Sequence, residues 1–191
     1  IFCTAPAQAE EGVALAIVYD TSGSMSEAVR DSSGKRSPKY KIANRALEAI
    51  ARQLQAYAGK PGEGAQRKIQ AGLFTFDGSG TRAAVPFGPL DAPAMIEWAR
   101  RFSSPGSGTP LGNAVRTAGD TVLKSTLSRK HVLVITDGMN TIGPDPAAVL
   151  PSLKKQAESK QAALGVHFVA FDVNASVFNS VKKQGATVLG A

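Results

Sequence analysis

The feature that most constrains this chain is an abrupt change of residue type near its N-terminus. Residues 13–19, Val-Ala-Leu-Ala-Ile-Val-Tyr, are apolar and include several β-formers, as expected for a strand buried on both faces. Asp20, Ser22 and Ser24 then place oxygen-bearing side chains at alternate positions, and Gly23 lies where a tight turn needs a residue without Cβ. Mg²⁺ prefers such hard oxygen ligands and keeps some of its waters. The stretch therefore predicts a buried strand that ends in part of a metal shell, with room for a further ligand.

A second apolar run, His-Val-Leu-Val-Ile-Thr at 131–136, predicts a central parallel strand, and Asp137 and Gly138 follow it directly. An Asp-Gly pair after a strand is often only a turn. Here it is the second acidic strand end after Asp20, and strand ends at a topological switch form the usual binding crevice of a doubly wound sheet. Two carboxylates held close together repel each other unless a cation lies between them. The pair therefore indicates a metal site.

Thr109 follows a loop rich in Ser, Gly and Pro at 103–108 and precedes a helix predicted to end near Lys124. Two roles are open for this threonine. Thr followed by Pro is a good N-cap and first helical residue, and this role needs no metal. In the other role, the Thr109 hydroxyl is a ligand of the same metal as the two carboxylates.

These three parts together resemble the von Willebrand factor A domain family, which includes integrin inserted domains and many bacterial surface proteins. The metal-ion-dependent adhesion site (MIDAS) of that family consists of Asp-x-Ser-x-Ser, a distant Thr and a later Asp. The matching segments here are Asp20-Thr21-Ser22-Gly23-Ser24, Thr109 within Gly-Ser-Gly-Thr-Pro-Leu, and Asp137 within Val-Ile-Thr-Asp-Gly. They occur in the family's order, and the resemblance runs from about Val13 to the end of the sequence.

The resemblance implies a protein-binding module for adhesion or assembly that depends on a divalent metal and is not an enzyme. Ser22 and Ser24 are expected to coordinate Mg²⁺ directly, or Mn²⁺ or Ca²⁺ in its place. Thr109 is expected to join directly or through water, and to move in and out of the shell. Asp20 and Asp137 are expected to hold the ion through waters or by direct bonds. A Glu or Asp carboxylate of a partner protein is implied to complete the shell.

The alternative from another functional class is a Mg²⁺-dependent phosphohydrolase of haloacid-dehalogenase type, with Asp20 as the nucleophile. Such enzymes need a second Asp two residues later as acid and base, and this chain has Ser22 there. The sequence therefore favours the binding module. His131 and His167 have no triad-like partners and are expected to be structural.

The element pattern predicts an α/β fold, a doubly wound and mainly parallel sheet with helices on both faces. The segments 68–76 and 81–87 are joined too closely for a crossover helix, so they predict one antiparallel strand at the sheet edge. The resemblance implies the same edge strand. The other predicted strands are 13–19, 131–136, 166–171 and 186–189, and the predicted helices are 40–57, 91–102, 109–124, 145–163 and 175–183.

Residues 26–39 are polar and turn-prone, and they predict an extended loop beside the metal site. This loop is either a surface insertion or a loop that contacts the ligand. Lys35 and Lys39, with Lys41 just after the loop, could touch an acidic partner, but a solvated position is the expected one.

Composition excludes several classes of function. The 191 residues carry a net charge of +7, yet Lys and Arg are scattered and not interleaved with aromatic residues, so no nucleic-acid platform is predicted. With 43% hydrophobic and 19% charged residues the chain is globular rather than disordered. It has no apolar run of about 18 residues, so no membrane span is predicted.

Residues 1–9 are uncharged and end in Ala7-Gln8-Ala9, which resembles the tail of a secretory signal peptide with a small-x-small cleavage site. We therefore expect a signal remnant at 1–9, with an ordinary N-terminal extension or an edge strand as the alternative, and a single domain at 10–191 that is secreted, periplasmic or on the cell surface of a bacterium. The only cysteine, Cys3, lies in the remnant, so the domain would have no disulfide. The resemblance implies that parts of the family's final strand and helix are missing.

Overall fold

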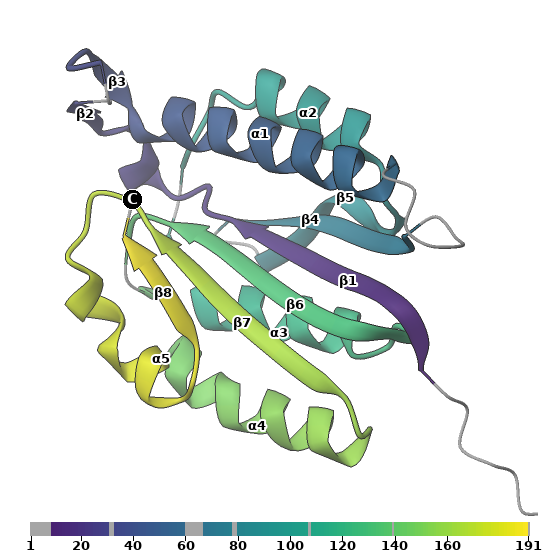
Figure 1. The fold of residues 1–191 in the computed structure, drawn as a ribbon. Helices are drawn as coiled ribbons and strands as arrows, with labels where there is room; N and C mark the ends of the chain where they lie inside the picture. Colours follow the sequence, from purple (N-terminus) through teal and green to yellow (C-terminus); the bar gives the residue numbers. More distant parts are fainter. Residues whose placement is uncertain are drawn as a thin grey trace, which may run out of the picture.

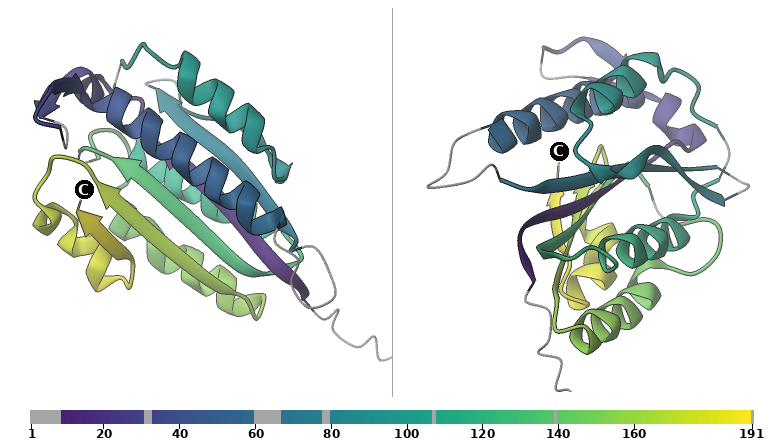
Figure 2. Two further views of the ribbon diagram at one scale, coloured as in Figure 1. Left: turned by 45° about the horizontal axis from the view of Figure 1, so that its top comes forward. Right: turned by 90° about the vertical axis from the view of Figure 1, so that its right-hand side faces the viewer.

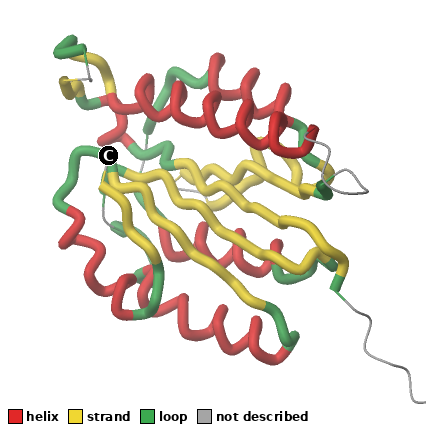
Figure 3. Tube along the Cα trace, viewed as in Figure 1, coloured by secondary structure: helices red, strands yellow, loops and turns green. Residues whose placement is uncertain are grey.

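The computed structural model describes residues 9–30, 33–59, 67–77, 80–106, 108–138 and 140–190, and the predicted signal remnant lies almost wholly outside them. At the centre is a six-stranded sheet in the order β5-β4-β1-β6-β7-β8. Its strands are β1 (Glu10–Tyr19), β4 (Ile69–Asp77), β5 (Gly80–Pro89), β6 (Leu127–Thr136), β7 (Ala163–Ala170) and β8 (Thr187–Gly190). All neighbours are parallel except β4 and β5. The predicted mainly parallel sheet with one antiparallel edge strand is confirmed, and Figure 3 shows its strands in yellow between the red helices.

Helices cover both faces of the sheet, as predicted (Figures 1 and 2). One face carries α1 (Lys39–Gly59) and α2 (Ala92–Arg101), and the other carries α3 (Leu111–Val122), α4 (Pro146–Ser159) and α5 (Asn179–Lys183). Two short 3₁₀ helices, η1 (Gly23–Ser26) and η2 (Ala175–Phe178), follow β1 and β7. None of the helices in the described part of the chain is long and apolar enough to cross a membrane.

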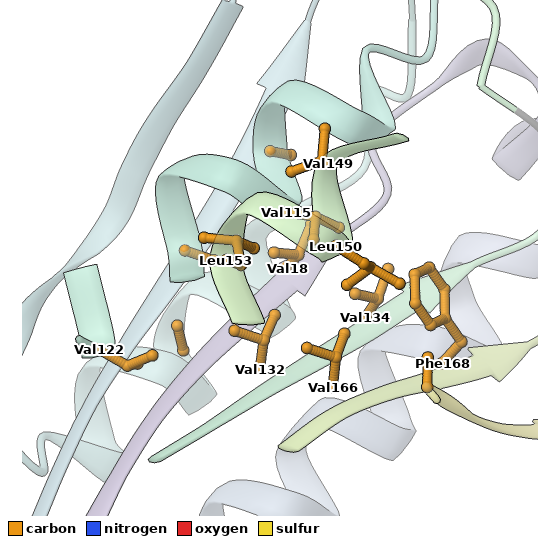
Figure 4. Packing of buried hydrophobic residues seen from close by; sticks show 14 of the residues in the cluster. Val18, Val115, Val122, Val132, Val134, Val149, Leu150, Leu153, Val166 and Phe168 are labelled. Carbon is orange, nitrogen blue, oxygen red and sulfur yellow. The ribbon is translucent and has the colours of Figure 1, made fainter. Parts of the chain in front are cut away.

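Strand β1 is apolar throughout its second half because both of its faces are covered. Ala16 and Val18 belong to the core under α3 and α4, whereas Ile17 and Tyr19 belong to the core under α1 and α2, and none of these four side chains is exposed. Figure 4 shows the first core, in which Val18 lies among valines and leucines of α3, α4 and β6. Burial on both faces fixes the end of β1 in place, and with it the start of the oxygen-rich loop.

Hydrogen bonds and ring contacts fix α1 and α2 relative to the end of β1. The Tyr19 hydroxyl donates to Asn44 Oδ1 at 2.6 Å, and Asn44 Nδ2 donates to the carbonyl of Phe102 at 2.9 Å. Trp98 stacks on Phe102 with ring centroids 4.9 Å apart and meets Tyr19 edge to face at 5.0 Å. The single tryptophan is therefore a packing residue, as expected for a side chain of this size.

The prediction of an extended loop at 26–39 is wrong. The structure places β2 (Ala28–Arg30) and β3 (Arg36–Pro38) there as a two-stranded antiparallel ribbon. Figure 1 shows the ribbon standing clear of the main sheet beside the start of α1. The strands are too short and too polar to show an alternating pattern, so backbone pairing alone defines them. Strand β6 also begins earlier than predicted, at Leu127, because the polar residues before His131 pair with β1 and β7.

His131 on β6 and His167 on β7 form a pair, with His131 Nδ1 3.2 Å from His167 Nε2. Burial, together with the positive charges of His167 and Arg129, lowers the pKa of His131.

Below a pH of about 6.5 the unfolded chain takes up a proton that the folded protein binds less readily, so acid reduces stability. We expect His131→Gln to lose less unfolding free energy than the wild type between pH 7.5 and pH 5. Urea denaturation at both pH values measures this, and an identical loss in the two proteins would contradict it.

Candidate metal site

The carboxyl ends of β1 and β6 lie side by side, and this pairing brings the two acidic strand ends together. The two strands are parallel neighbours with Tyr19 opposite Ile135, and the amide of Asp20 donates to the Ile135 carbonyl at 2.9 Å. Residues 20 and 136 are thus at the same edge of the sheet, and Asp137 follows directly. In Figure 1 the arrowheads of β1 and β6 point to this edge.

Hydrogen bonds between side chains join three of the five predicted site residues. Ser22 Oγ lies 3.0 Å from Ser24 Oγ, and Ser24 Oγ donates to Asp137 Oδ1 at 2.8 Å. The 3₁₀ helix η1 makes this possible, because it turns the chain sharply after Ser22 and returns Ser24 toward β6. The first and third parts of the motif, 113 residues apart, are therefore in direct contact.

Asp20 is fully buried, and both of its oxygens accept hydrogen bonds. Oδ1 accepts from the amide of Ser22 at 2.8 Å, and Oδ2 accepts from Thr136 Oγ1 at 2.6 Å. Burial raises the pKa of Asp20, the hydrogen bonds from Ser22 and Thr136 act in the opposite direction, and the nearby Asp137 carboxylate raises it further. A cation beside the two carboxylates would offset both unfavourable effects. Thr136 was not predicted as a site residue, although its position at the end of a predicted strand, directly before Asp137, was visible in the sequence.

Thr109 lies just before α3 and is 5% exposed. Its amide donates to Thr141 Oγ1 at 2.8 Å, and its carbonyl accepts from the Thr141 amide at 2.9 Å, which ties it to the segment after Asp137. The N-cap of α3 is Pro110, without a side-chain cap, so the capping role considered for Thr109 is wrong. Among the described residues, the Thr109 hydroxyl makes no hydrogen bond to the other four predicted ligands.

Further contacts hold the three loops against one another. The amide of Gly106 donates to the carbonyl of Thr21 at 2.9 Å, which joins the loop before Thr109 to the first motif. Asn140 Oδ1 accepts from the amide of Gly112 at 3.1 Å, which joins the segment after Asp137 to α3. Asn140 is a second residue that the sequence did not single out.

Lys39 is the largest departure from the sequence prediction, which expected it to be solvated. Its side chain is 6% exposed, and its Nζ lies 3.0 Å from Asp137 Oδ2 and 2.8 Å from Glu27 Oε2. Burial alone would lower the pKa of Lys39, but the hydrogen bonds to Glu27 and Asp137 outweigh it and raise that pKa. The hydrogen bond from Lys39 lowers the pKa of Glu27. A permanent positive charge therefore touches one of the two buried carboxylates.

The donors at this edge suit a hard divalent cation. They comprise the carboxylates of Asp20 and Asp137 and the hydroxyls of Ser22 and Ser24, with that of Thr109 on the adjoining loop, and Mg²⁺ and Mn²⁺ prefer such oxygens. In the part of the chain that the structure describes, no group of three or more His, Cys, Asp or Glu side chains is placed to hold a metal. A site that is built largely on hydroxyls and holds only two carboxylates is compatible with this finding.

The sequence model of the von Willebrand factor type A domain matches residues 14–187, so the chain belongs to this family. A search of curated protein sequences gives no significant match.

Solved structures of the same fold include proteins of quite different origin. The vWF domain of the type V pili tip protein Mfa5 from Porphyromonas gingivalis aligns over 95% of this chain and 90% of its own, with a TM-score of 0.66 and 13% identity. Proximal thread matrix protein 1 from the mussel byssus, with a zinc-occupied MIDAS motif, aligns over 95% and 44%, with a TM-score of 0.67 and 14% identity. The PilB minor pilin from Streptococcus sanguinis aligns over 98% and 58%, with a TM-score of 0.65 and 13% identity. The chain thus spans only about half the length of the latter two, and at these identities the likeness concerns the fold.

Proposed function

We propose that this chain is a protein-binding module whose binding depends on a divalent metal, Mg²⁺ or Mn²⁺, at the carboxyl edge of β1 and β6. The observation that carries the proposal is the chain of contacts from Ser22 through Ser24 to Asp137, at 3.0 and 2.8 Å. These contacts join the loop after β1 to the loop after β6 at the carboxyl edge of the sheet, and they involve oxygen atoms alone. The metal, when bound, would supply a positive centre that accepts a carboxylate from the partner.

Each proposed ligand has a distinct task that follows from its surroundings. Ser22 and Ser24 present neutral oxygens, so they hold the ion without cancelling its charge. Asp20 is buried and accepts a hydrogen bond from Thr136, so it fixes the start of the loop and contributes negative charge from the end of β1. Asp137 shares its two oxygens between Ser24 and Lys39. Thr109 lies on a separate loop that Thr141 ties to the segment after Asp137, and its hydroxyl joins the ion directly or through water.

The phosphohydrolase alternative is not favoured by the surroundings of Asp20. A nucleophilic carboxylate needs an exposed oxygen aimed at phosphorus. Asp20 is 0% exposed, and both of its oxygens already accept hydrogen bonds. The acid–base position two residues later is Ser22. We therefore propose that the chain binds without catalysis.

The partner and the place of action belong to the same proposal. Mfa5 is described as a pilus tip protein and PilB as a minor pilin. We propose that this chain likewise acts outside the bacterial cytoplasm, on another protein that presents a Glu or Asp. The division into a leader remnant and one domain over 10–191 stays a prediction.

Metal removal tests the proposal. Saturating Mg²⁺ or Mn²⁺ at about 100 times its Kd should add about 2.7 kcal/mol of stability, or roughly 5–10 °C in Tm, and EDTA should reverse it. Thr109→Val should reduce this shift, because it removes one oxygen donor and leaves a side chain of similar shape. Thermal unfolding measures the shift, and a phosphatase assay runs alongside. No metal-dependent shift in the wild type, or metal-dependent phosphatase turnover, would contradict the proposal.

A further inference from the structure

The ammonium of Lys39 is enclosed by carboxylates from three segments of the chain. Glu27 lies between η1 and β2, Asp137 follows β6, and Asp172 follows β7, with contacts of 2.8, 3.0 and 3.5 Å. The side chains of Glu27 and Asp172 are 68% and 53% exposed, so water screens their charges. Asp137 is 0% exposed, and so it is the only one of these three partners that is buried together with Lys39.

The position of Lys39 runs against the local preferences of the chain. It is the first residue of α1, and a positive charge at a helix N-terminus is unfavourable. Lysine is also rarely buried without a partner. The backbone amide of Lys39 donates to the carbonyl of Glu27 at 2.9 Å, so the β2–β3 ribbon holds the residue in place. Since such departures from local rules concentrate at functional sites, the contact with Asp137 calls for a functional explanation.

We propose, on the basis of the function proposed above, that Lys39 sets the charge balance of the metal site and thereby creates its demand for an acidic partner. With both carboxylates ionised, as the ligation of a cation requires, Asp20, Asp137 and Lys39 together carry one net negative charge at the buried site. A divalent cation would turn this into one net positive charge, and a single outside carboxylate would neutralise it. Without the ammonium, the two carboxylates alone would balance the cation.

This charge balance affects the binding of the metal and the binding of the partner carboxylate in opposite directions. Asp137 Oδ1 bonds Ser24 and Oδ2 bonds Lys39, so a cation near Ser24 would share a carboxylate with the ammonium. The two positive charges would repel each other across a buried group, where screening is weak. Lys39 therefore weakens the binding of the metal alone, and it strengthens the binding of a carboxylate to the metal-loaded protein.

Titration of Mn²⁺ into the wild type, Lys39→Met and Lys41→Met tests this inference. Lys41 is exposed and two residues away, so Lys41→Met makes the same change in net charge outside the site. The Kd for Mn²⁺ should fall at least tenfold in Lys39→Met and change less than twofold in Lys41→Met. Acetate added to the Mn²⁺-loaded proteins should displace Mn²⁺-bound water, seen by proton relaxation, more weakly in Lys39→Met than in the other two.

Circular dichroism shows whether Lys39→Met folds, and a second pair of variants tests the inference if it does not. Glu27→Gln removes an exposed competitor for the ammonium and leaves it to Asp137, so its Kd for Mn²⁺ should rise two- to fivefold. Glu158→Gln, near the end of α4 and also exposed, removes the same charge elsewhere and should leave the Kd unchanged. Equal Mn²⁺ affinities across all folded variants would overturn the inference alone. If the wild type does not bind Mn²⁺, the proposed function fails and the inference fails with it.

Discussion

Replacing Ser24 by alanine is expected to weaken the binding of Mg²⁺ and Mn²⁺ by at least about 100-fold. Loss of a residue that only supports a metal ligand typically costs 10- to 100-fold in affinity, and Ser24 is proposed as a direct ligand. Its hydroxyl also connects Ser22 to Asp137, so its removal breaks a direct side-chain contact between the first and third parts of the motif. Isothermal titration of each metal into the variant measures the loss.

Ser26→Ala is the matched control for Ser24→Ala. Both serines belong to η1, but Ser26 is exposed, and so its replacement should leave the metal affinity unchanged. The apo forms of both variants should melt close to the wild type, since neither change opens a cavity in the core. A Ser24→Ala protein that binds Mg²⁺ as tightly as the Ser26→Ala protein would exclude Ser24 as a ligand.

The second large effect is expected from Gly112→Ala in α3. A Cβ at this position would overlap the carbonyl oxygen of Pro144 and lie 2.9 Å from its carbonyl carbon. These atoms are backbone and cannot turn aside as a side chain would, so α3 must move away from the segment before α4. We expect a loss of about 3 kcal/mol or more in unfolding free energy, or roughly 6–12 °C in Tm.

The same substitution should also weaken metal binding, because the Gly112 amide holds Asn140 and α3 follows Thr109. Gly88→Ala on β5 is its control, since a Cβ there meets no atom within 4 Å. That variant should be as stable as the wild type or up to about 1 kcal/mol more stable. Equal melting temperatures for the two alanine variants would show that α3 does not pack tightly against the Pro144 segment.

The fold was predictable because its strongest signals are local. The run at 13–19 is apolar without alternation, which indicates a strand covered on both faces, and the short connection after 68–76 forces an antiparallel edge. The β2–β3 ribbon had no such signal. Its strands are three residues each and carry arginine at their ends, so neither periodicity nor burial distinguishes them from a loop.

The arrangement of the candidate site was predictable only where the sequence carries a motif. Asp20, Ser22 and Ser24 are close together along the chain, so the sequence alone reveals them as a group. Lys39 is 98 residues from Asp137, and its position depends on a ribbon that the sequence did not reveal. Thr136 meets Asp20 only because β1 and β6 pair in one register rather than another. Contacts of this kind are set by tertiary structure and leave no pattern in the chain.

The direction of β1 decides how this protein should be attached to a surface for binding measurements. The strand is ten residues long, so its first residue, Glu10, lies about 30 Å from the edge where Asp20 begins the loop. β8 runs parallel to β7 and ends at the opposite side from Glu10, near the ends of β1 and β6 (Figure 1). A biotin or affinity handle placed ahead of Glu10 should leave the loops free to meet an approaching molecule, whereas one placed after Gly190 would crowd them.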